Sequence, residues 1–115
     1  MIACLALLVL GGVSAAAPSP VPDCTGPSRW PATMALVQLK NAGITSPEKI
    51  VPERTTVVRL ASEPLGNGLY RQVHLVTFVE RSGKATQVIT VSDASFEECS
   101  MSEVRVFVIS RQLGN

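Results

Sequence analysis

Hydrophobic and polar residues alternate along residues 70–93, YRQVHLVTFVERSGKATQVITVSD, and this alternation predicts a β-hairpin. Both arms are rich in Val, Ile, Thr, Phe and Tyr, the residue types that favour strands. Ser82-Gly83 separates the arms, and Gly accepts the positive φ that a tight turn needs. A two-residue turn at this pair predicts the register Arg81 opposite Lys84, Val76 opposite Ile89, His74 opposite Val91 and Gln72 opposite Asp93.

In this register one face of the hairpin is apolar and the other is mixed. The apolar face carries Tyr70, Val76, Phe78, Ile89 and Val91, and such a face requires a cover. The opposite face carries Arg71, Val73, Leu75, Thr77, Val79, Thr86, Val88 and Thr90. We therefore expect both sides of the sheet to be partly covered.

Two more strands and one helix complete the pattern. Residues 54–62 and 103–113 alternate as strands do, and in the second segment Val104, Val106 and Val108 share a face. Residues 29–44, RWPATMALVQLKNAGI, have helical spacing, with Pro31 in the first turn and Gly43 as a stop. The residues that form the apolar face of this helix are Ala32, Ala35, Leu36 and Leu39.

One helix followed by four strands with short connections predicts an α+β fold. We expect an N-terminal helix packed on a curved four-stranded antiparallel meander that is held by one disulfide. Cystatin-like folds share this architecture, but shared architecture carries no functional weight.

The first seventeen residues have the form of a secretory signal peptide. An apolar run over residues 2–13 is followed by Ala15, Ala16 and Ala17, which predicts cleavage after Ala17. No Lys or Arg precedes the run, which departs from the usual pattern of a signal peptide. A buried N-terminal helix is the alternative interpretation. The predicted organisation is a signal peptide at 1–17, a proline-rich leader at 18–28 and a single α+β domain at 29–115, placed in the periplasm or secreted.

Two cysteines remain in the mature chain, because Cys4 would leave with the signal peptide. An even number of cysteines in an exported domain predicts a disulfide, here between Cys24 and Cys99. Two free thiols or a metal pair are the alternatives. Two cysteines and one histidine make a poor structural zinc site.

Charge and motifs narrow the function classes. Ten basic and nine acidic residues are interspersed and give a net charge of +1, which favours neither a nucleic-acid partner nor, after signal removal, membrane insertion. The chain has no G-x-S-x-G, H-E-x-x-H, C-x-x-C or phosphate-binding glycine loop, and His74 is its only histidine. We expect no enzymatic activity, no cofactor and no metal, with His74 at the edge of an apolar face and its ring bonded to backbone or to Asp93. Charge and motifs leave the oligomeric state open.

Two groups of residues are candidates for contact with a partner protein. Acidic residues gather around Cys99, where they form a solvated loop, a cation site or a partner-contact loop, although the spacing does not fit a calcium loop. Arginines and an aromatic residue lie on the strands, where they either bind a partner or cover the sheet with their stems. The candidate partner-binding residues are Arg71, Arg105, Phe107, Arg111, Glu97, Glu98 and Asn67, the last in the predicted turn at 64–68.

Residues 70–114, YRQVHLVTFVERSGKATQVITVSDASFEECSMSEVRVFVISRQLG, resemble a type of small uncharacterised exported protein of Gram-negative bacteria. The resemblance implies a periplasmic setting, in which small disulfide-bonded domains without catalytic groups serve as inhibitors or immunity proteins. The leading hypothesis is a non-catalytic periplasmic binding protein that occludes a partner enzyme or toxin. The alternative is an envelope accessory module that holds a small hydrophobic ligand between helix and sheet.

Overall fold

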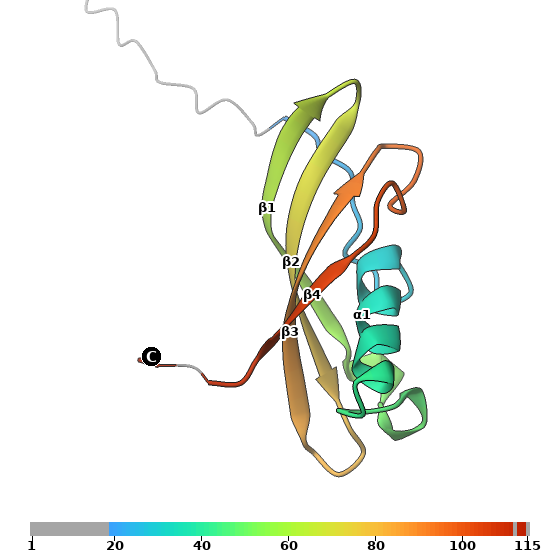
Figure 1. Ribbon diagram of the computed structural model, residues 1–115, viewed down its shortest axis with the longest axis vertical. Coiled ribbons are helices and arrows are strands. Elements are labelled where there is room, and N and C mark those ends of the chain that lie inside the picture. Colours follow the sequence, from blue (N-terminus) through green and yellow to red (C-terminus); the bar gives the residue numbers. More distant parts are fainter. Residues whose placement is uncertain (1–18, 112, 115) are drawn as a thin grey trace, which may run out of the picture.

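The computed structural model describes residues 19–111 and 113–114, so the predicted signal peptide lies outside the described residues. Helix α1 (Trp30–Asn41) is followed by two 3₁₀ turns, Pro47–Lys49 and Pro52–Arg54. Four strands follow: β1 (Thr56–Gly66), β2 (Leu69–Val79), β3 (Ala85–Ala94) and β4 (Arg105–Ile109). They form one antiparallel sheet in the order β1-β2-β3-β4, with α1 against one face (Figure 1). The α+β meander predicted from the sequence is confirmed.

Helix α1 packs on the sheet through the residues that its sequence spacing predicts. Pro31 lies in its first turn, where a missing N–H costs nothing, and Gly43 follows its end with φ 71°. The helix buries Ala32, Ala35 and Leu39 against a core that contains Ile50, Val76, Phe78 and Val88. The small alanine side chains allow the helix to lie close to the strands.

The register of the β2–β3 hairpin differs from the sequence prediction by one residue. The Glu80 N–H donates to the Lys84 carbonyl, and the Gly83 N–H donates to the Glu80 carbonyl, so the loop has three residues rather than two. Gly83 has φ 92°, and a left-handed Gly at this place is typical of a three-residue hairpin loop. The observed pairs include Val76 with Val88, His74 with Thr90 and Gln72 with Ser92.

A shift of one residue exchanges the two faces of β3, because side chains alternate with a period of two. Ile89 and Val91 therefore lie on the face of the sheet that is turned away from the helix. The sequence prediction had placed them on the same face as Val76 and Phe78. The buried residues of β2 and β3 on the helix side include Gln72, His74, Val76, Phe78, Thr86, Val88, Thr90 and Ser92. We call the other face, which is turned away from α1, the open face.

The outer strands differ from the prediction in length. β1 begins at Thr56 and continues through Pro64 to Gly66, so it includes part of the predicted turn. β4 covers only Arg105–Ile109 of the predicted 103–113. The alternation predicted for β4 is confirmed, because Val106 and Val108 pair with helix-side residues whereas Phe107 pairs with Ile89 of the open face.

The leader covers the part of the helix-side face that α1 leaves free (Figure 1). Gln72 Nε2 donates to the Pro22 carbonyl at 2.9 Å. Trp30 Nε1 donates to the Ser102 carbonyl at 3.0 Å. Cys24 and Cys99 form the predicted disulfide, with 5.8 Å between their Cα atoms. The leader and the β3–β4 loop are thus joined above the start of the helix.

Candidate functional site

The open face carries a continuous apolar row across all four strands. Val58 of β1 pairs with Leu75 of β2, Leu75 pairs with Ile89 of β3, and Ile89 pairs with Phe107 of β4. We call these four residues the apolar row. Phe107 is 53% exposed and Val58 is 51% exposed, and α1 lies on the other side of the sheet. Large apolar side chains gathered on an uncovered surface mark interaction sites.

The next row along the same face is apolar except for one arginine, and the row after it is charged. The adjacent row contains Ala61, Val73, Val91 and Arg105, and the one after it contains Glu63, Arg71 and Asp93. Arg71 Nε donates to Asp93 Oδ1 at 3.1 Å, and this hydrogen bond raises the pKa of Arg71. Arg71, Asp93, Glu103 and Arg105 line a surface hollow of about 340 Å³. The open face is therefore apolar in its middle and charged at one end.

The structure brings together three of the candidate partner-binding residues. Arg71, Arg105 and Phe107 share the open face. Arg111 follows β4 and is exposed. Glu97 and Glu98 lie in the β3–β4 loop, and Asn67 lies in the β1–β2 turn with φ 55°.

The β3–β4 loop leans toward the helix side of the sheet. The ring of Phe96 contacts the ring of Tyr70 edge-on, with 5.5 Å between the ring centroids, and Tyr70 belongs to the helix-side face. Glu97 and Glu98 of this loop are not among the residues that line the hollow with Arg71 and Arg105. They form a separate candidate surface.

Val58, Leu75 and Ile89 were not predicted as site residues from the sequence. The two-residue turn placed Ile89 on the face with Phe78 and left Leu75 among threonines. A three-residue loop with Gly83 in its last position would have placed Leu75 opposite Ile89. Gly83 was visible in the sequence, but the residues of this turn fit a loop of two residues as well as a loop of three.

A row of polar side chains is buried beneath the leader. Gln72 and His74 of β2 and Thr90 of β3 are 0% exposed. Neither ring nitrogen of His74 has a hydrogen-bond partner among the described residues, and Asp93 lies on the other face, so the predicted bond to backbone or Asp93 is wrong. Burial lowers the pKa of His74, the charge of Arg59 lowers it further, and Asp23 acts in the opposite direction.

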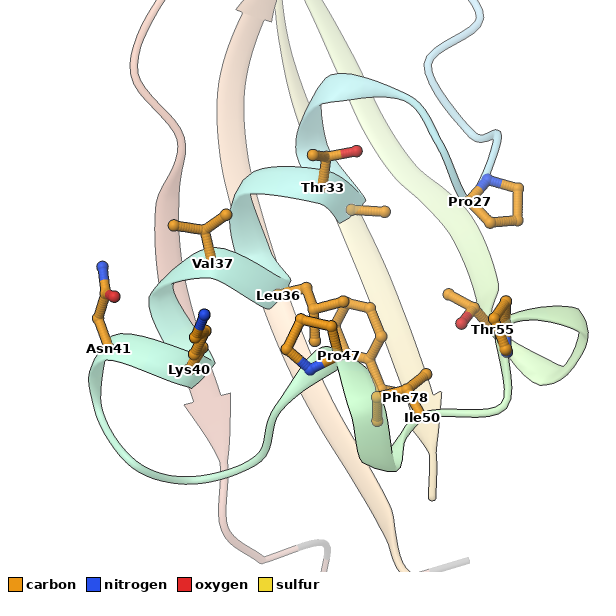
Figure 2. Close-up of a pocket in the computed structure, with 12 residues that line it drawn as sticks. Pro27, Thr33, Leu36, Val37, Lys40, Asn41, Pro47, Ile50, Thr55 and Phe78 are labelled. Atoms are coloured by element: carbon orange, nitrogen blue, oxygen red, sulfur yellow. The ribbon is translucent and has the colours of Figure 1, made fainter. Parts of the chain in front are cut away.

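An apolar groove lies between α1 and the two 3₁₀ turns and has a volume of about 460 Å³. Figure 2 shows Leu36, Pro47, Ile50 and Phe78 gathered in the groove, with Lys40 beside them. A groove of this volume and lining falls in the range of small-molecule sites.

Comparisons of the chain with protein-family models, with curated proteins and with solved structures found no match. Within residues 19–111 and 113–114, no three side chains of His, Cys, Asp or Glu come together as metal ligands would. None of the helices in the described part of the chain has the length and apolarity that crossing a membrane would require. The disulfide is consistent with an oxidising location outside the cytoplasm.

Proposed function

We propose that this protein is a non-catalytic binding protein of the periplasm or the secreted fluid, which occludes a partner enzyme or toxin with the open face of its sheet. The observation that carries the proposal is the apolar row, which crosses four strands and ends in exposed Phe107. Burying such a row on a partner removes apolar surface from water, which is the main favourable contribution to association.

The position of the row on a sheet favours tight binding. Strand residues are already ordered by the backbone hydrogen bonds of the sheet, so docking immobilises little further chain. Arginine and aromatic residues dominate binding energy at protein interfaces, and Arg71, Arg105 and Phe107 all belong to the open face. Arg105 forms no ion pair among the described residues, so we expect an acidic group of the partner opposite it.

The first experiment identifies the partner. Mature, oxidised protein immobilised on a resin is expected to capture a stoichiometric enzyme or toxin from a periplasmic extract. Recovery of no protein at micromolar affinity would contradict an inhibitory role, because an inhibitor must bind its target at cellular concentrations.

Removing the apolar side chains of the row is expected to weaken this complex. Phe107→Ser and Val58→Ser should each raise the dissociation constant roughly tenfold or more, because exposed aromatic and apolar anchors are typical hot spots. Both side chains are more than half exposed, so the fold should tolerate the changes. Isothermal titration with the captured partner measures the effect.

A matched control comes from the other candidate surface. Phe96 is 56% exposed on the β3–β4 loop, so Phe96→Ser removes a similar apolar area away from the open face. We expect it to leave the affinity unchanged. If Phe96→Ser or Glu97→Lys weakens the complex while Phe107→Ser does not, the loop is the binding surface and the open face is not.

The groove between α1 and the 3₁₀ turns supports a second candidate function, the binding of a small apolar molecule that carries an acidic group. Its walls are apolar, and Lys40 supplies a positive charge beside them. Decanoate at millimolar concentration is expected to raise the midpoint of thermal unfolding, because a ligand that binds only the folded state stabilises it.

Variants of the groove test this assignment. Val37→Trp would fill the groove and should abolish the thermal shift, and Lys40→Gln should reduce it by removing the charge. Lys84→Gln, a change of the same type in the β2–β3 hairpin loop, is the control. An unchanged midpoint at saturating decanoate, or equal shifts in all variants, would exclude this ligand class.

A further inference from the structure

The two edges of the sheet differ in how they are protected against pairing with another strand. β1 has register shifts between Arg59 and Ala61 and between Pro64 and Gly66, and Pro64 has no N–H to donate. β4 pairs with β3 in unbroken register through all five of its residues and contains no Pro, Gly or bulge. Proteins protect edge strands with bulges, proline and charge. β4 has one charged residue, Arg105, but no bulge or proline, so it is the less protected of the two edges.

β4 also exposes apolar side chains on both of its faces. Phe107 is 53% exposed on the open face, and Val108 is 46% exposed on the helix side. A hollow of about 180 Å³ lies beside the strand on the helix side, lined in part by Leu39, Val106 and Val108. A strand added along β4 would cover apolar surface on both faces of the sheet at once.

We propose that the strand added to β4 is the β4 of a second copy of this chain, paired antiparallel across a two-fold axis at Phe107. In this register Phe107 faces Phe107 of the second copy, Val106 faces Val108, and Arg105 faces Ile109. Glu103 then faces Arg111, and the two-fold axis repeats this pair. The segment EVRVFVISR is thus complementary to itself in both apolar character and charge.

Charge selects this register over its neighbours. Neither Glu103 nor Arg111 forms an ion pair within residues 19–111 and 113–114, and both are exposed. Sliding the second copy by two residues in one direction would bring Arg105 opposite Arg111, and sliding it in the other direction would bring Met101 opposite Arg111. Of these three registers, only the one centred on Phe107 places the Glu103 of each copy opposite an arginine of the other.

The dimer would be one continuous sheet. A two-fold axis perpendicular to the sheet places both α1 helices on one side and both open faces on the other. The second copy therefore leaves the apolar rows accessible, and the two rows join end to end at Phe107. This inference does not depend on the proposed inhibitory role, because β4 pairs through its edge whether or not the open face binds a partner.

Charge reversal tests the pairing. Sedimentation velocity of the mature, oxidised protein from about 1 to about 500 μM should show a monomer–dimer equilibrium. Glu103→Arg and Arg111→Glu alone should each raise the dimer dissociation constant roughly tenfold, because each places like charges opposite one another twice. The double variant exchanges the charges and should restore the wild-type constant.

Glu97→Arg, an exposed charge reversal on the β3–β4 loop, is the matched control and should not change the dimer. Amide hydrogen exchange at residues 104–110 should slow as the concentration rises. A protein that is monomeric throughout, a dimer that both single variants leave intact, or a double variant that stays monomeric would each overturn the inference. Arg111 lies outside the strands, so its variant remains informative if Glu103→Arg impairs folding.

Discussion

Replacing Cys24 and Cys99 by serine is expected to lower the free energy of unfolding by about 4 to 5 kcal/mol in the chain-entropy view. The bridge joins residues separated by 75 positions, so it removes a long loop from the unfolded ensemble. The bridge also holds the leader on the sheet, where Pro22 accepts the Gln72 hydrogen bond. A small domain is stable by only about 5 to 15 kcal/mol, so this loss is a large part of the total.

Urea unfolding of the oxidised protein and of the double serine variant measures this difference. The reduced wild-type protein should match the variant, because both lack the bridge and differ only in two sulfur atoms. A loss below about 1 kcal/mol would show that the leader is held by its other contacts and that the disulfide contributes little.

Acidification is expected to destabilise the protein through His74. The pKa of His74 is lowered below its ordinary value of 6.5 by burial, so the folded state resists a proton that the unfolded state accepts. Above pH 6.5 His74 is neutral in both the folded and the unfolded state and costs no stability. As the pH drops from 6.5 toward the pKa of His74 in the folded state, only the unfolded state takes up the proton, and the free energy of unfolding falls. The slope in that interval approaches about 1.4 kcal/mol per pH unit.

His74→Leu removes this titration. Between about pH 7 and about pH 5 the free energy of unfolding of the wild type should fall more steeply with falling pH than that of the variant, because only the wild type carries an imidazole whose pKa is lowered by burial. Urea unfolding across the series measures the difference in slopes, which cancels the carboxylates common to both proteins. Equal slopes would mean that His74 is protonated as readily in the folded protein as in the unfolded chain.

Local sequence patterns were sufficient to predict the elements and the bridge. The spacing of Ala32, Ala35 and Leu39 predicts the buried face of α1, and the alternation around Phe107 predicts the two faces of β4. Such patterns depend on the period of one element, which residues close in sequence define. The pairing of Cys24 with Cys99 followed from counting the cysteines of the predicted mature chain.

The candidate site could be predicted only in part. Arg71, Arg105 and Phe107 were named from composition, and the structure places them on one face. Their grouping with Leu75 and Ile89 was lost because it depends on a loop of two or three residues. A change of one residue there inverts every side chain of β3.

Tertiary packing alone decided which loop forms, which face of β3 is covered and where the leader lies. Val88 reaches the core beneath α1 only in the observed register. The leader lies over Gln72, which donates to the Pro22 carbonyl, and the disulfide joins the leader to the β3–β4 loop. Local residue preferences specify a helix or a strand, since their causes lie within a few residues. The register and the covering of a face depend on burial summed over segments far apart in the chain, and that sum is defined only once the fold has formed.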